Sequence, residues 1–132
     1  MDQAMRRKVE TFLIIGLGGV IGANLRYVVS VWAVGQFGSG FPWGTLIINL
    51  TGSCLLAVFL GWLANHTAVD PRVRLLVATG FFGAYTTFST YAYDSIAMGG
   101  TGNWIGAVAN VLGTNLLCLF SALIGLAIGS NL

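Results

Sequence analysis

The sequence predicts an all-α membrane protein made of four transmembrane helices. Of its 132 residues, 56% are hydrophobic and only 8% are charged, whereas a soluble domain carries about 25% charged residues. Apolar stretches recur along the chain, and four of them are long enough to cross a bilayer, which takes about 20 helical residues. We therefore expect residues 1–132 to form a single four-span membrane domain.

The four predicted spans lie near residues 11–34, 43–65, 72–98 and 103–129. Clusters of turn-forming residues separate them, and these clusters occupy residues 36–42, 66–71 and 99–103. Glycines spaced four apart would also permit close contact between helices, although such pairs carry little weight in a chain with 19 glycines. These pairs are Gly18/Gly22, Gly102/Gly106 and Gly125/Gly129.

The third predicted span contains an unusual polar run at residues 83–91, with four Ser or Thr hydroxyls and three aromatic side chains. Each unpaired polar group in hydrocarbon costs several kcal/mol, so the run marks a candidate site. Gly80 and Gly83 would let the helix unwind here if protein or a water-filled cavity covers the freed backbone. A continuous helix whose hydroxyls bond back to preceding carbonyls fits the sequence equally well.

The basic residues predict the orientation. With four spans, both termini and the second loop share one side of the membrane, and that side holds five of the six basic residues. The positive-inside rule therefore places both termini in the cytoplasm. The five residues are Arg6, Arg7, Lys8, Arg72 and Arg74.

Composition argues against several function classes. The chain has one His, four acidic residues and no grouping of a nucleophile with a base, so we do not expect an enzyme. Its few basic residues form no patch for nucleic acid. Cys54 and Cys118 lie in apolar runs without metal-ligand spacing, and we interpret them as small packing residues.

Polar residues recur at helical spacing inside the spans. In the second span they are Thr45, Asn49 and Ser53, and in the fourth they are Asn110, Thr114 and Cys118. Residues four apart share a helix face, as would Tyr85, Phe88 and Tyr91 if the third span is helical. Such tracks either line a path or join helices by hydrogen bonds. Because they hold donors but no carboxylate or Lys, a path would suit a small anion better than a proton-coupled cation.

Arg26 and Asp94 are the charges expected within or near the membrane, toward the side opposite the termini. An unpaired charge there costs a few kcal/mol. We expect a structural ion pair or snorkelling to the interface. An electrostatic role for Arg26 at an anion entrance is the alternative.

The chain resembles the Fluc (CrcB) fluoride channels over nearly its whole length. The resemblance rests on three blocks: Gly18-Gly19-x-x-Gly22-Ala23-x-Leu25-Arg26-Tyr27, Gly44-Thr45-Leu46-x-x-Asn49-Leu50 and Thr79-Gly80-Phe81-x-Gly83-x-x-Thr86-Thr87-Phe88-Ser89-Thr90. It implies an antiparallel, dual-topology dimer in the bacterial inner (plasma) membrane. That dimer would hold two fluoride pores, each built from both subunits.

The resemblance also implies roles for individual residues. Asn49 would face the pore, Phe88 would be the first of two aromatic box residues, and Ser89 and Thr90 would lie beside the box. Backbone carbonyls of Gly83 and Thr86 would hold a central Na⁺ shared across the dimer axis. The polar track of the fourth span would correspond to Asn110, Thr114 and Cys118.

The sequence departs from the family pattern at several positions. Tyr91 replaces the second box Phe, Asp94 replaces a usual Glu, and the track of the fourth span lacks its common Tyr/Ser/Ser character. The five-to-one charge bias is also unusual for a dual-topology homodimer, which needs a nearly balanced distribution of Lys and Arg.

The leading hypothesis is a passive fluoride-selective channel that exports cytoplasmic fluoride and limits its toxicity. The charge bias suggests an alternative, a fixed-orientation subunit that pairs with an opposite-orientation paralogue or serves as a non-conducting partner. A small multidrug-resistance-like exporter is a further alternative. That class needs a membrane-embedded carboxylate in its first span, where this chain has only Glu10 at the edge.

Overall fold

The structure, a computed structural model, describes residues 2–132 and contains no β-strand within that range. Three helices are each long and apolar enough to cross a membrane: α1 (Gln3–Phe37), α2 (Trp43–Asn65) and α6 (Trp104–Gly129). The segment expected as the third span is divided into α3 (Pro71–Arg74), the π-helix η1 (Leu75–Phe82), α4 (Gly83–Tyr85) and α5 (Phe88–Gly100). The prediction of an all-α membrane fold is therefore confirmed.

The helix ends follow local chain chemistry. α2 has the predicted limits, but α1 begins eight residues earlier than the predicted residue 11 because residues 3–10 continue the helix as good helix formers. α1 ends at Phe37, and the following residue, Gly38, has a φ of 76° that favours glycine. Asp70 caps α3 by accepting a 2.8 Å hydrogen bond from Arg72 N, and Pro71 occupies the first helical position.

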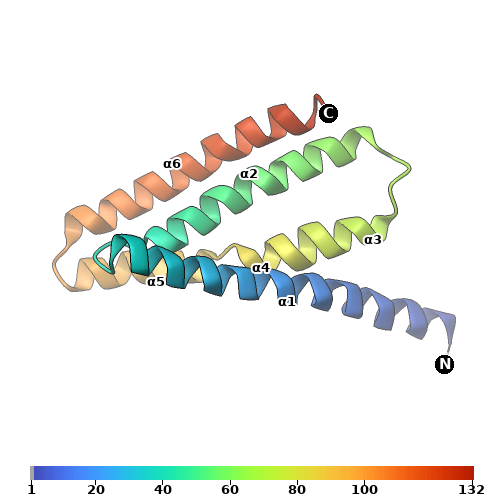
Figure 1. The fold of residues 1–132 in the computed structure, drawn as a ribbon, viewed down its shortest axis with the longest axis horizontal. Coiled ribbons are helices and arrows are strands. Elements are labelled where there is room, and N and C mark those ends of the chain that lie inside the picture. The colour runs from blue at the N-terminus through green and yellow to red at the C-terminus, as the bar shows by residue number, and fades with distance from the viewer. Residues whose placement is uncertain (1) are drawn as a thin grey trace.

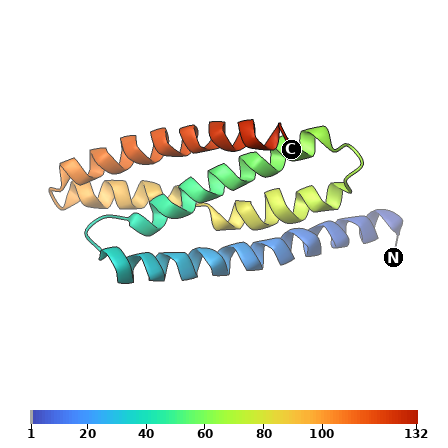
Figure 2. The same ribbon diagram turned by 45° about the horizontal axis from the view of Figure 1, so that its top comes forward.

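The helices form an elongated bundle in which α1, α2, the divided third segment and α6 run along the same long axis (Figures 1 and 2). α2 packs along α6, α1 packs along η1 and α4, and α5 packs along α6. Both termini and the connection between α2 and α3 lie at one end of the bundle (Figure 1). The five basic residues of the orientation prediction therefore belong to this end, whose cytoplasmic location stays a prediction.

Glycines allow two of the helix contacts to be close. A Cβ on Gly18 or Gly22 of α1 would overlap the backbone of η1, including the carbonyl oxygen of Phe81. Gly125 and Gly129 of α6 lie in the same way against backbone carbonyls of α2. The pairs Gly18/Gly22 and Gly125/Gly129 thus permit close packing. The pair Gly102/Gly106 does not, because Gly102 has a φ of 84° in a turn and Gly106 lies under the capping side chain of Asn103.

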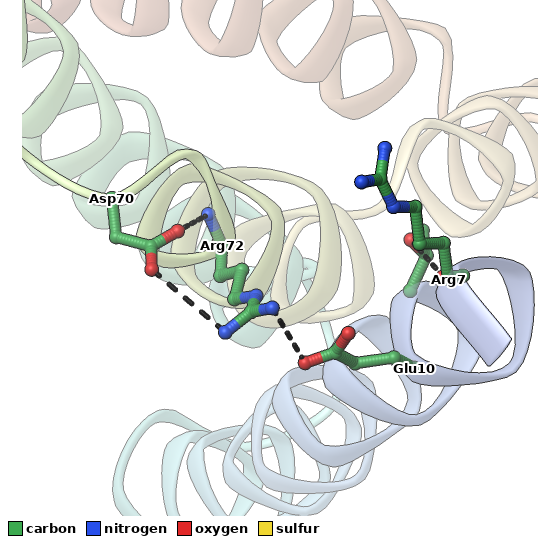
Figure 3. Close-up of polar contacts among 5 residues, drawn as sticks. Arg7, Glu10, Asp70 and Arg72 are labelled. Carbon is green, nitrogen blue, oxygen red and sulfur yellow. Dashed lines mark hydrogen bonds and ion pairs between the residues drawn. The ribbon is translucent and has the colours of Figure 1, made fainter. Parts of the chain in front are cut away.

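An ion pair joins α1 to the start of the third segment. Arg72 Nη2 lies 2.9 Å from Glu10 Oε1, and Arg72 Nη1 lies 4.0 Å from Asp70 Oδ2 (Figure 3). The side chain of Arg7 points away from Glu10 in the same view. All three paired side chains are about half exposed, so the contact orients the loop and adds little stability.

Large apolar side chains cover the outside of the bundle, as expected for a surface that faces lipid. Phe12 is 73% exposed, Phe88 76% and Ile105 87%. The interior is small and is centred on Ile48, Phe82 and Tyr85. Polar side chains share this interior, and among the described residues every buried side-chain nitrogen or oxygen has a hydrogen-bond partner.

Candidate functional site

The candidate site is built around an interruption between α4 and α5. The helix ends at Tyr85, and the backbone is extended at Thr86 (φ −77°, ψ 157°) and at Thr87 (φ −148°, ψ 114°). It becomes helical again at Phe88. The interruption falls in the polar run that the sequence marked as a candidate site.

Asn49 of α2 holds the interruption by both ends of its amide. Its Nδ2 donates to the Thr87 carbonyl at 2.9 Å, and its Oδ1 accepts from Thr87 N at 2.8 Å. Thr87 is buried, with 6% of its surface exposed. Asn49 thereby satisfies two backbone groups that a continuous helix would satisfy internally. The second hydrogen on Nδ2 is free to point elsewhere.

The interruption removes the usual helical partners of two carbonyls. Thr87 N, the normal partner of the Gly83 carbonyl, donates to Asn49 instead. Thr90 N, the normal partner of the Thr86 carbonyl, donates to Thr87 Oγ1, which caps α5. The carbonyl oxygens of Gly83 and Thr86 are therefore available as neutral ligands for a hard cation. The described residues include no cluster of three or more His, Cys, Asp or Glu suited to a metal.

A cavity of about 330 Å³ lies beside the interruption, between α2, α5 and α6. Its polar lining comes from Asn49, Ser53, Thr86, Thr87, Tyr91, Thr114, Asn115 and Cys118, and its aromatic lining includes Phe88. None of the residues that line it carries a carboxylate, an amine or a guanidinium. The two predicted polar tracks thus meet at this cavity through Asn49 and Ser53 on one side and Thr114 and Cys118 on the other.

Other members of the predicted tracks join helices instead. Asn110 is fully buried; its Nδ2 donates to Ser95 Oγ at 2.9 Å, and its Oδ1 accepts from Thr114 Oγ1 at 3.1 Å. Ser95 Oγ in turn donates to the Tyr91 carbonyl. In this chain Asn110 therefore links α6 to α5.

Arg26 and Asp94 do not pair with each other. Asp94 Oδ2 accepts a 2.9 Å hydrogen bond from Thr45 Oγ1, and the ion pairs of the described residues involve only Arg72 with Glu10 and Asp70. The described residues thus contain no ion pair of Arg26 or Asp94, and a neutral hydroxyl bonds the carboxylate instead; snorkelling of Arg26 to the interface stays a prediction. Arg26 lines a separate cavity of about 260 Å³ together with Thr45 and Thr90.

The remaining predicted residues follow the interruption and differ in their exposure to solvent. Phe88, Ser89 and Thr90 are exposed, whereas Tyr91 is buried with 7% of its surface exposed. The shared face expected for Tyr85, Phe88 and Tyr91 is lost, because the chain is extended between the first two. Tyr85 is buried, and its hydroxyl lies 2.9 Å from Thr51 Oγ1 of α2.

Sequence reasoning missed Asn115. Its Nδ2 donates to the Tyr91 hydroxyl at 2.6 Å, and the residue lines the cavity beside Thr114. An amide in an otherwise apolar span was a usable signal, but the residue does not fall on the four-residue spacing of the track. The one-residue offset concealed it.

Sequence comparison relates the chain to one protein family and to several named proteins. Residues 13–126 match the family described as CrcB-like protein, Camphor Resistance (CrcB). The chain is 48% identical over 115 residues to a protein of Koribacter versatilis, which covers 87% of this chain and 91% of that protein. It is 40% identical over 118 residues to a protein of Aquifex aeolicus, covering 89% and 95% of the two chains, and 38% identical over 121 residues to one of Chloroflexus aurantiacus, covering 92% and 96%.

Each of these three relatives is named fluoride-specific ion channel FluC. The family match spans the glycine contacts of α1, the amide clamp formed by the two Asn49 hydrogen bonds to the Thr87 backbone, and the interruption before α5. From this match and these identities, the chain belongs to the CrcB family.

Proposed function

We propose that this protein is a passive, fluoride-selective channel that lets cytoplasmic fluoride leave the cell. The observation that carries the proposal is the cavity beside the interruption, which is lined by neutral polar groups and two aromatic rings and by no charged side chain. The names of the relatives support fluoride as the ion. Fluoride is small and tightly hydrated, so a pore has to replace its water with hydrogen-bond donors.

Neutral donors suit conduction because binding must be strong enough for entry and weak enough for exit. Asn49 offers its second amide hydrogen, and the ring edge of Phe88 carries partial positive charge. A Lys or Arg in the lining would hold the anion too tightly. Arg26, in the neighbouring cavity, lies where it would attract anions without lining this one.

We propose further that a Na⁺ ion is held by the carbonyl oxygens of Gly83 and Thr86. The fit is supported by the hydrogen bonds that divert their helical partners, Thr87 N and Thr90 N, to other acceptors. Two carbonyls are too few to replace the hydration shell of a cation, so a second subunit would have to supply more oxygen ligands. When bound, the cation adds a positive potential that favours an anion nearby.

The proposed assembly is an antiparallel dimer with two pores in the bacterial inner membrane. Phe88 supports this, since a bare aromatic ring at the edge of the cavity leaves that edge for a partner to complete. The five-to-one charge bias supports the variant in which the partner is an opposite-orientation paralogue.

Efflux from liposomes tests the function. Purified protein reconstituted alone should release fluoride but not chloride from loaded vesicles, and no proton gradient should be needed. Fluoride release that appears only after co-reconstitution with an opposite-orientation relative would support the heterodimer. Release of chloride at the fluoride rate would contradict a fluoride-selective pore.

A further inference from the structure

The hydroxyl of Tyr91 is held by an amide from the neighbouring helix. Asn115 Nδ2 donates to Tyr91 Oη at 2.6 Å and to the Val111 carbonyl at 2.7 Å. An amide nitrogen carries two hydrogens, so these two bonds use both of them. The Val111 bond anchors the amide to its own helix, and the Tyr91 hydroxyl is left in the role of acceptor.

A hydroxyl that accepts a hydrogen bond still has its own hydrogen to donate. Among residues 2–132 the Tyr91 hydroxyl makes no other hydrogen bond. Both Tyr91 and Asn115 line the 330 Å³ cavity beside the interruption. The free hydrogen therefore belongs to a group at the cavity wall.

Most other hydroxyls of this cavity are already used as donors inside the protein. Thr86 Oγ1 donates to the Phe82 carbonyl at 2.9 Å, Thr87 Oγ1 donates to Thr90 Oγ1 at 3.0 Å, and Thr114 Oγ1 donates to Asn110 Oδ1 at 3.1 Å. Tyr91 differs from these three threonines because its hydroxyl accepts a hydrogen bond and donates to no acceptor among the described residues. A phenol hydroxyl is also a better hydrogen-bond donor to an anion than an aliphatic hydroxyl, because the aromatic ring withdraws electron density from its oxygen.

We propose that Asn115 is a positioning residue that turns the Tyr91 hydroxyl into a fluoride donor at the cavity wall. This inference rests on the proposed channel function. It assigns Tyr91 a role that depends on its oxygen atom and not only on its ring. It also assigns Asn115 a role that acts entirely through Tyr91.

The test measures the initial rate of fluoride release from proteoliposomes at a series of internal fluoride concentrations. This separates the half-saturating concentration from the maximal rate. Tyr91→Phe removes only the oxygen, Asn115→Leu removes the amide at similar volume, and the double variant removes both. Asn131→Leu is the matched control, because the side-chain amide of Asn131, just beyond the end of α6, bonds only the Ala127 carbonyl.

We expect Tyr91→Phe and Asn115→Leu each to raise the half-saturating fluoride concentration about tenfold, the loss of one hydrogen bond to a charged group. The double variant should be no worse than either single variant, since Tyr91→Phe removes the donor and Asn115→Leu acts only by releasing that same donor. Asn131→Leu should match the wild type.

Two results would overturn the inference while leaving the channel function intact. One is an unchanged half-saturating concentration in Tyr91→Phe, a variant that keeps the aromatic ring and lacks only the hydroxyl oxygen. The other is an effect of Asn115→Leu that persists in the Tyr91→Phe background. Absence of fluoride release from the wild type would instead overturn the proposed function, and this inference with it.

Discussion

Replacing Asn49 with alanine tests whether the amide clamp maintains the interruption before α5. The substitution removes the donor to the Thr87 carbonyl and the acceptor from Thr87 N, at 2.9 and 2.8 Å. Thr87 is 6% exposed, so water has little access to either group. Both backbone groups are then left without a partner next to the cavity.

The expected cost lies between two limits. Hydrogen bonds between membrane helices average about 0.6 kcal/mol each, which gives about 1 kcal/mol for two. A buried group left unsatisfied costs about 1–3 kcal/mol, which gives as much as about 6 kcal/mol for two. We expect about 2–4 kcal/mol, because the extended backbone at Thr86 and Thr87 can relax partly but cannot bond to itself.

Thermal unfolding in detergent and fluoride efflux from liposomes together measure the effect. Asn24→Ala is the matched control, since the Asn24 amide bonds only the Val20 carbonyl of its own helix at 2.7 Å. Asn49→Ala should lower the midpoint of unfolding by several degrees relative to Asn24→Ala and reduce the rate of efflux. If the two variants unfold at the same temperature and pass fluoride equally well, the clamp is not what holds the interruption.

Three further predictions concern packing, the aromatic edge and the ion pair. Gly22→Val should abolish the folded protein, because the new side chain would overlap the Phe81 carbonyl. Gly16→Val should be tolerated, because no atom lies within 4 Å of a Cβ at that position. Size-exclusion profiles distinguish the two variants, and a normal profile for Gly22→Val would refute the close contact. Phe88→Ile should reduce fluoride efflux with little change in the unfolding temperature, since the ring is 76% exposed. Efflux at the wild-type rate in this variant would contradict a role for the Phe88 ring in binding fluoride. Glu10→Gln should change the free energy of unfolding by less than about 1 kcal/mol, because the Arg72 pair is half exposed; a larger loss measured by chemical unfolding would show that the pair does more than orient the loop.

Hydrophobic runs and turn clusters predicted the limits of α2 and the start of α6 closely, but not the start of α1 or the division of the third segment. α2 spans the predicted 43–65, and α6 begins one residue after the predicted 103. The start of α1 was placed too late because charged residues ended the apolar run, although they are good helix formers and continue the helix beyond it. Apolarity marks where a chain meets lipid, but it does not mark where a helix stops.

The site was harder to predict because contacts between helices depend on rotation and register. Four-residue spacing placed Asn49 and Asn110 on equivalent tracks, yet Asn49 binds the interruption and Asn110 is enclosed between α5 and α6. Asp94 was expected to be a charge in need of a counter-ion, and a hydroxyl of α2 satisfies it instead. The role of Asn115 could not be predicted from its own helix, because it depends on the packing of α6 against α5, which places the Asn115 amide 2.6 Å from the Tyr91 hydroxyl.

The most direct test of the central claim is the reversal potential of the current that the protein carries across a planar bilayer. Solutions with opposed fluoride and chloride gradients, and with a separate pH gradient, assign the current to one ion. A passive fluoride-selective channel predicts reversal at the Nernst potential of fluoride, whatever the proton gradient. Reversal at the chloride potential, or a potential that follows the proton gradient, would contradict it.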